Sequence, residues 1–355
     1  MKKILTALAI LTMCTSSAFA FSKQSLNTEF VLLPTMNAET NQQNRAWVGT
    51  FQLVWNDFQN YIVKKPIKFV TDKNNKTVKE LNKQKFTEKM LSLNSYYKTY
   101  GAISPKLKED IESGIKKKFN ETSDILDMFD WTPDYNKYLV YAMLKKDFKF
   151  EVPFDKLDEG RFGKFPTKVQ YFGIDDNSKK EVRDNVKILF YYNENDYGVQ
   201  LKTQGKDVVY LYKTTADKNF EKLYRDMQIK TKAYVDSKEF GKKDKLRIPD
   251  INLYKLEKYT DLTGKEIQGK NMYISDAVQT LDFKMNNEGV KLKSEAAIAT
   301  MKCSIEIEEE KPRNFYFDDT FVLFLQENNK KQPYFALRVY DLALINATGK
   351  PEKKE

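Results

Sequence analysis

The side chains that most often carry out catalysis are scarce in this chain. It has no histidine and two cysteines among 355 residues, whereas aspartate and glutamate together number 50. Histidine is the commonest general base, the usual partner of nucleophilic serine and cysteine, and the commonest metal ligand. No phosphate-binding loop, dinucleotide fingerprint or EF-hand loop is present either. We therefore expect no metal site, no cofactor and no enzymatic activity.

Carboxylates alone leave one catalytic route open. Two acidic side chains about 5–9 Å apart in a cleft can hydrolyse glycosidic bonds. The acids are spread along the whole chain, so the sequence does not show which of them are neighbours. A carboxylate-based hydrolase acting on envelope sugars stays open as an alternative.

The first twenty residues have the layout of a secretory signal peptide. Two lysines at 2–3 precede an apolar stretch over 4–13, and Ala-Phe-Ala at 18–20 is a small-x-small cleavage site. The apolar stretch is too short to span a bilayer as a helix, and no second long one follows. We expect residues 1–20 to be removed and the protein to be exported to the periplasm or the exterior of a bacterium, without a transmembrane segment.

The cysteine content and the charge pattern of the remaining chain restrict its bonds and its partners. Cys303 would be the one remaining cysteine, so no intramolecular disulfide can form. Its flanking residues alternate with apolar ones, which favours a buried thiol. The net charge is +10, but lysines and acids are interleaved, and the longest basic run is residues 116–118. This pattern favours a solvated mixed-charge surface, and we expect no nucleic-acid partner.

Apolar residues that recur at three- and four-residue steps predict the helices. They cover residues 46–62, 77–93, 105–119, 121–130 and 217–228. The first has the cleanest pattern, one broad apolar stripe. For the third, Ser104 can cap the N-terminus and Pro105 suits the first helical position. Asp217 is the cap that we expect for the last.

The rest of the pattern is strand-like. The continuous apolar run over 138–144 is typical of a strand covered on both faces. Further strands are predicted within 168–213 and over 246–254, 279–287, 299–307, 315–326 and 333–345. Helices first and strands later indicate an α+β fold. We expect one domain over 21–348 and a loose charged tail over 349–355.

Several short segments follow one another in a recognisable order. They lie at 246–251, 286–289, 294–300, 312–315, 318–324 and 334–339, with a weaker one at 150–154. Residues 294–300 read Ser-Glu-Ala-Ala-Ile-Ala-Thr, close to the Thr-Glu-Ala-Ala-x-Ala-Thr hinge of serpins. In order and spacing, residues 246–345 resemble the C-terminal part of a serpin. The resemblance implies N-terminal helices followed by large mixed and antiparallel sheets.

The resemblance also implies a reactive loop. It assigns the hinge of that loop to Ser294, Glu295, Ala296, Ala297, Ala299 and Thr300. It assigns the candidate scissile region to Ile307, Glu308, Glu309, Glu310 and Lys311. The partner implied is a serine or cysteine protease, whose cleavage would let the loop insert into a sheet as an extra strand.

Some residues depart from the family's pattern. Four extra residues, 290–293, precede the hinge, Lys293 stands in place of a hinge glycine, and Tyr141 replaces a buried asparagine. If Ala296 faces the core, Lys302 and Glu306 share its face, and unpaired buried charges are costly. The opposite parity, over 297–307, gives an apolar face typical of an ordinary half-buried strand.

Two interpretations of the resemblance therefore stay open. In the first, the chain is an exported serpin-like protein that binds and inhibits a protease through residues 294–311. In the second, it is a non-inhibitory binding or structural protein of the envelope on the same scaffold. The substitutions at Tyr141 and Lys293 favour the second, and the ordered segments favour the first.

Overall fold

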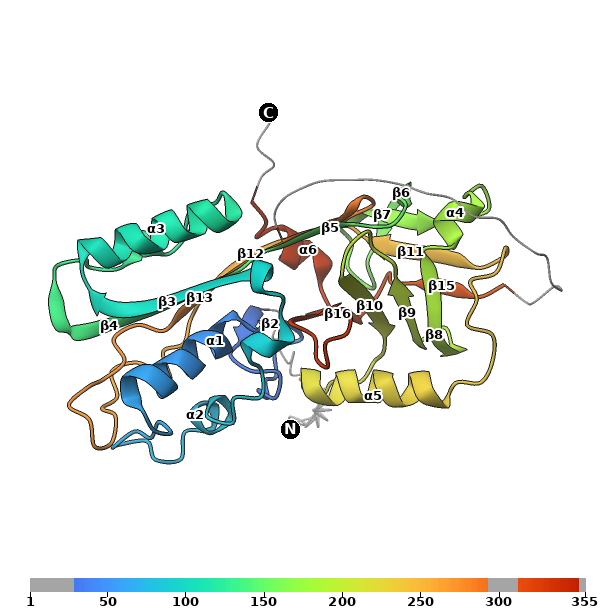
Figure 1. The fold of residues 1–355 in the computed structure, drawn as a ribbon. Helices are drawn as coiled ribbons and strands as arrows, with labels where there is room; N and C mark the ends of the chain where they lie inside the picture. Colours follow the sequence, from blue (N-terminus) through green and yellow to red (C-terminus); the bar gives the residue numbers. More distant parts are fainter. Residues whose placement is uncertain (1–28, 293–311, 351–355) are drawn as a thin grey trace, which may run out of the picture.

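The computed structural model describes residues 29–292 and 312–350. Strands form four sheets, and helices lie mainly in the first third of the chain and against the sheet faces (Figure 1). The α+β fold class predicted from the sequence is confirmed. The signal-like segment at 1–20 and the strand predicted at 299–307, with Cys303, lie outside the described residues.

The largest sheet has seven strands and is antiparallel except for its first pair. In spatial order the strands are β1 (Phe30–Leu33), β2 (Asn44–Val48), β17 (Phe335–Val339), β16 (Phe321–Glu327), β10 (Asp207–Lys213), β9 (Asp196–Leu201) and β8 (Val186–Asn193). Every residue of β2, β16 and β17 is buried. The centre of this sheet is therefore covered on both faces.

Three smaller sheets complete the β structure. One contains β15 (Asn314–Tyr316), β11 (Lys245–Pro249), β7 (Lys168–Ile174) and β6 (Asp155–Arg161) in spatial order. A second contains β12 (Ile251–Lys258), β13 (Val278–Asn286), β14 (Gly289–Leu292) and β5 (Lys146–Lys149). The third pairs β3 (Tyr96–Ile103) with β4 (Asp134–Leu144).

The helices are placed by the sheets that they cover. They are α1 (Thr50–Asp57) with a π-helical continuation (Phe58–Val63), α2 (Lys76–Leu81), α3 (Pro105–Phe119), α4 (Lys180–Arg183), α5 (Phe220–Ala233) and α6 (Leu342–Asn346). Helix α3 packs on one face of the β3–β4 pair through Leu107, Ile111 and Ile115, which cluster with Tyr141. Helix α1 contacts the opposite face of β4 (Figure 1).

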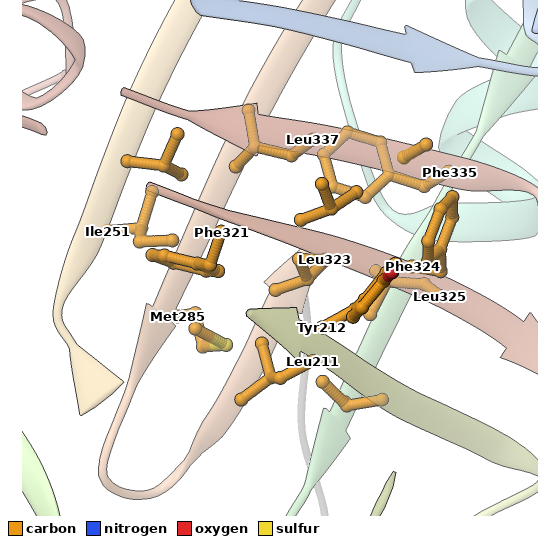
Figure 2. Packing of buried hydrophobic residues seen from close by; sticks show 14 of the residues in the cluster. Leu211, Tyr212, Ile251, Met285, Phe321, Leu323, Phe324, Leu325, Phe335 and Leu337 are labelled. Atoms are coloured by element: carbon orange, nitrogen blue, oxygen red, sulfur yellow. The ribbon is translucent and has the colours of Figure 1, made fainter. Parts of the chain in front are cut away.

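The main core fills the space between the seven-stranded sheet and the β12–β13 strands. Figure 2 shows Leu323, Phe335 and Leu337 of the large sheet packed toward Ile251 and Met285. The rings of Phe283 and Phe335 lie 4.7 Å apart across this layer. On the other face of the large sheet, α5 presents Tyr224 to Phe324 at a ring distance of 5.2 Å. This layering holds β13 firmly from one side.

Capping and backbone hydrogen bonds explain which predicted helix boundaries are confirmed and which are wrong. Helix 105–119 is confirmed, with the Ser104 hydroxyl accepting the Leu107 N–H. The helix predicted over 46–62 is wrong at its start, because residues 44–48 pair as β2 and the Gly49 N–H bonds to the Tyr334 carbonyl. The last helix begins at Phe220, and its cap is Asn219 rather than Asp217.

Other boundaries differ for similar reasons. The helix predicted over 77–93 ends at Leu81 and continues as short 3₁₀ turns, and that over 121–130 is a single 3₁₀ turn at Leu126–Met128. The strand predicted over 333–345 divides into β17 and α6, because Asp341 caps a new helix by accepting the Leu344 N–H. Strand β3 was not predicted.

Candidate functional site

A cavity of about 1190 Å³ separates β4 from β13. Asp134 and residues 136–145 line one side, and residues 276–282 line the other. Strand β4 pairs with β3 on its far edge, and the 278–283 part of β13 pairs with β12 on its far edge. Within the part of the chain that the structure describes, neither facing edge has a strand partner. The cavity is therefore a gap in what would otherwise be a continuous sheet.

One end of this gap is filled by β14. Its residues pair with 284–286 of β13 on one side and with 146–149 of β5 on the other. Val290 lies opposite Met285 and Phe148, and all three side chains are buried on the same face. Strand β5 follows β4 after Lys145. Strand β14 therefore fills, at one end, the strand position that is empty in the rest of the gap.

The floor of the gap is aromatic. Phe51, Val54 and Trp55 of α1, with Phe58 of the π-helix, line the cavity from below. The Trp55 indole N–H donates to the Asn82 side-chain oxygen at 3.0 Å, which orients the ring. The apolar side chains at helical spacing in α1 and its π-helical continuation are therefore partly core and partly cavity wall.

The roof is the connection between α3 and β4, and its residues 121–125 line the cavity. On the β4 side, the Lys145 ammonium bonds to the Glu121 carboxylate at 2.8 Å. On the β13 side, the Lys350 ammonium lies 2.8 Å from Asp124 and 3.3 Å from Asp282. The predicted tail at 349–355 thus begins with residues held against the fold, since Asn252 donates to the Lys350 carbonyl.

A buried charge cluster lies beside β14. The Lys146 ammonium bonds to Glu327, lies 2.8 Å from Asp207, and faces the Tyr334 ring at 4.9 Å. Burial works against ionisation of Glu327, but hydrogen bonds from Lys146 and Ser92 lower the pKa of this carboxyl to about 2. Burial raises the pKa of Asp207, and its attraction to Lys146 opposes that shift. The cluster joins β5 to the seven-stranded sheet.

The cavity wall contains a pair of carboxylates on which the hydrolase alternative can be judged. Asp124 and Asp282 both line the gap, and both bind Lys350. A glycosidase needs space for the sugar and water between its two carboxyl groups. Here the ammonium group lies between them, an arrangement that holds structure together. In residues 29–292 and 312–350, no group of three or more acidic or thiol side chains is arranged to hold a metal.

The predicted hinge, Ser294, Glu295, Ala296, Ala297, Ala299 and Thr300, lies outside the described residues. So does the predicted scissile region, Ile307, Glu308, Glu309, Glu310 and Lys311. Nothing in the sequence indicates the gap itself. The apolar run at 138–144 predicts a strand, but its composition does not show which of its edges is paired. Among the described residues, no helix combines the length and the apolar character that crossing a membrane requires.

The segments that resemble those of serpins lie in or beside strands of the structure. Residues 246–249 form most of β11, and β13 ends at Asn286 just before the β14 turn. The segments at 312–315, 318–324 and 334–339 lead into β15, β16 and β17 in that order. The chain has an α+β fold in which these segments follow one another as strands.

The comparisons with known proteins give the following results. No protein-family model matches the sequence, and no curated protein sequence matches it. Solved structures that match include thyroxine-binding globulin in complex with thyroxine, at 11% identity and a TM-score of 0.42 over 66% of this chain and 64% of that one. The match thus spans slightly less than two thirds of that globulin.

Two further solved structures match this chain. Human thyroxine-binding globulin complexed with thyroxine matches at 9% identity and a TM-score of 0.44, over 77% of this chain and 82% of that one. Serpin48, a highly specific serpin of the insect Tenebrio molitor, matches at 15% identity and a TM-score of 0.39, over 72% and 78%. These matches assign no ligand and no target to this chain.

Proposed function

We propose that this chain is an exported serpin-like protein that binds a serine or cysteine protease through residues 294–311. After cleavage in the region from Ile307 to Lys311, the segment that begins at Ser294 fills the gap between β4 and β13. The observation that carries the proposal is the position of β14. It occupies one end of the gap and leads directly into the predicted hinge. Export rests on the signal-like residues 1–20.

The pairing of β14 sets the register of the inserted strand. Val290 lies opposite Met285 and Phe148. Because both neighbours run antiparallel to β14, six residues further along Ala296 would lie opposite Gln279 and Ala142. Side chains directly opposite one another in a sheet share a face. Ser294, Ala296, Ile298 and Thr300 would therefore face α1, as Val290 faces the core.

This register limits the cost of the charged residues. On the same face, Lys302 would lie opposite Asn136, which is exposed near the start of β4 at Asp134. Glu306 would lie beyond the end of β4. Lys302 and Glu306 would thus lie at or beyond the end of the gap, and the cost of burying their charges would be avoided. Lys293 would lie on the other face, between Asp282 and Lys145, so attraction to one neighbour is opposed by repulsion from the other.

Insertion has a physical driving force. The facing edges of β4 and β13 carry backbone N–H and C=O groups without strand partners among the described residues. Each new backbone hydrogen bond contributes about 0.5–1.5 kcal/mol net. A strand paired along both edges makes several of them, and its small side chains also cover the aromatic floor. The sum supplies the free energy with which a cleaved loop could hold a protease.

The test is a matched pair of variants exposed to a panel of trypsin-like, elastase-like and papain-like proteases. We expect the unmodified chain to form an SDS-resistant complex with at least one of them. Ala296→Arg places a charge over Phe51 and Trp55, and we expect it to turn the chain into a substrate that is cut without complex formation. Ala297→Arg points to the opposite face and should keep more of the complex. Equal behaviour of the two variants contradicts the register, and no complex with any protease contradicts inhibition.

A non-inhibitory binding protein on this scaffold is the second candidate. The observation that favours it is the sequence position of Lys293, which follows Leu292 directly and stands in place of the hinge glycine of the family's pattern. In this case the loop would be cut by proteases without insertion. The intact and cut chains would then exchange backbone amides of residues 138–144 at the same rate, whereas insertion protects these amides. Strong protection after cleavage contradicts the second candidate.

A further inference from the structure

The connection between α3 and β4 crosses the gap and is fastened on both sides. We call residues 121–125 of this connection the strap. All five residues line the cavity, and the strap is bonded to the β4 side through Glu121 and to the β13 side through Asp124. A strand that entered the gap would have to pass beneath the strap. The stability of its two fastenings therefore bears directly on access to the gap.

The fastening on the β4 side is the stronger one. Lys145 and Glu121 have side chains only 9% and 10% exposed, and their charged groups are 2.8 Å apart. The Lys145 ammonium also donates to the Phe119 carbonyl at 2.9 Å, at the end of α3. A buried, hydrogen-bonded ion pair is strongly destabilising to break, because it leaves a buried charge without its partner. This side of the strap acts as a fixed end.

The fastening on the β13 side is weaker and of a different kind. Lys350 binds both Asp124 and Asp282, but the three side chains are 40%, 42% and 37% exposed. Solvent-exposed ion pairs contribute at most about 1 kcal/mol each. The Lys350 ammonium also lies 4.2 Å from the centre of the Tyr254 ring, which helps to position it. This side of the strap can release while the other side remains bonded.

Lys350 reaches the strap because the chain before it is bound along β12. The Asn346 side-chain oxygen accepts the Asn252 N–H, and the Thr348 hydroxyl accepts the Tyr254 N–H. The Asn252 side chain then donates to the Lys350 carbonyl at 3.2 Å. The segment 346–350 thus runs beside β12 from α6 toward the strap (Figure 1). It delivers a cation from the far end of the sequence to the edge of the gap.

We propose that Lys350 is a positioning residue that latches the strap across the gap, so that the C-terminal segment controls how fast a strand can enter. The strap opens at Asp124 and pivots about the Glu121–Lys145 pair. The role of the latch in loop insertion rests on the function proposed above. The latch itself is a property of the uncut chain and can be measured separately.

The experiment compares Lys350→Gln, Lys350→Arg and a matched control, Lys222→Gln, in the full mature chain. Lys222 is paired with Glu39 on the surface, away from the gap, so its loss controls for removal of an exposed ion pair. Two quantities are measured for each variant. One is the exchange rate of the backbone amides of residues 121–125 in the uncut protein. The other is the rate at which a synthetic peptide with the sequence of residues 294–304 binds, followed by native gel mobility.

We expect Lys350→Gln to raise both rates about two- to five-fold, as the loss of one or two exposed ion pairs implies. Lys350→Arg should restore them, and Lys222→Gln should leave them unchanged. Asp124→Asn should match Lys350→Gln, and combining the two should add nothing further. Unchanged amide exchange in Lys350→Gln overturns the latch. Faster exchange with no peptide binding in any variant upholds the latch and counts against strand insertion.

Discussion

The ammonium group of Lys146 is bonded to the carboxylate of Glu327, and both side chains are almost fully buried, at 6% and 1% exposed. The two residues come from β5 and β16, so the pair connects the strand beside β14 to the seven-stranded sheet. Glu327 also accepts hydrogen bonds from Ser92 and Ser95, at the entry to β3. One carboxylate thus holds three parts of the fold around the closed end of the gap.

Replacing this carboxylate should destabilise the whole protein. In Glu327→Gln, Lys146 keeps Asp207 but loses its most buried partner. Removing one member of a buried ion pair costs about 3–5 kcal/mol. We expect a loss near the lower end of that range in urea denaturation.

The matched control for this change is Glu39→Gln. Glu39 pairs with Lys222, and the two side chains are 69% and 63% exposed. Exposed ion pairs contribute at most about 1 kcal/mol, so the control should change the unfolding free energy only slightly. Similar losses in Glu327→Gln and Glu39→Gln would contradict the role given to the buried cluster.

The same cluster predicts how stability depends on pH. The pKa of Glu327 is about 2 in the folded protein, below its ordinary value of 4.5. A lowered carboxyl pKa stabilises the fold above the ordinary value, and this contribution is lost as the pH falls toward the folded pKa. Asp207 has a raised pKa and therefore opposes part of the loss.

The measurement is the urea unfolding free energy between pH 5 and pH 2. We expect it to fall through this interval in the unmodified protein and to fall less steeply in Glu327→Gln. Equal slopes for the two proteins would show that Glu327 is not responsible for the acid sensitivity.

Gly289 of β14 lies directly against the backbone of β5. A Cβ atom at this position would lie 2.3 Å from the Phe148 carbonyl oxygen and 2.7 Å from the Lys149 Cα, which are backbone atoms. Gly289→Ala should therefore push β14 away from β5 and cost about 1–3 kcal/mol, as overpacking does. The exposed neighbour Glu288 provides the control, Glu288→Ala. Faster amide exchange at residues 146–149 in Gly289→Ala alone is the expected result, and equal exchange in both variants would contradict it.

Much of the scaffold could be predicted because its signals are local. The helix at 105–119 has its own cap, its own proline and its own apolar stripe, so no distant contact is needed to define it. The apolar stripe at 46–62 was misleading at its start because β2 and α1 are both apolar and are divided only by Gly49, whose N–H bonds to Tyr334. Strand β3 was missed because its apolar residues alternate poorly, and its pairing with β4 decides its conformation.

The candidate site could not be predicted for a physical reason. The gap is defined by two strands that do not pair, and composition carries no sign of a missing partner. The Lys146–Glu327 pair joins residues 181 positions apart, and the Lys350–Asp124 pair joins residues 226 positions apart. Lysine and acidic residues are so common in this chain that no such pair can be selected from the sequence.

The most direct test of the account is the melting temperature of the chain before and after a single cut between residues 300 and 311. The cut chain is purified from the protease with its two fragments still associated, and both forms are melted in a calorimeter. If the freed segment enters the gap beside β4, several new hydrogen bonds form, and we expect the cut form to melt at least about 10 °C higher. A cut form that melts at the same temperature as the intact chain, or below it, would contradict insertion.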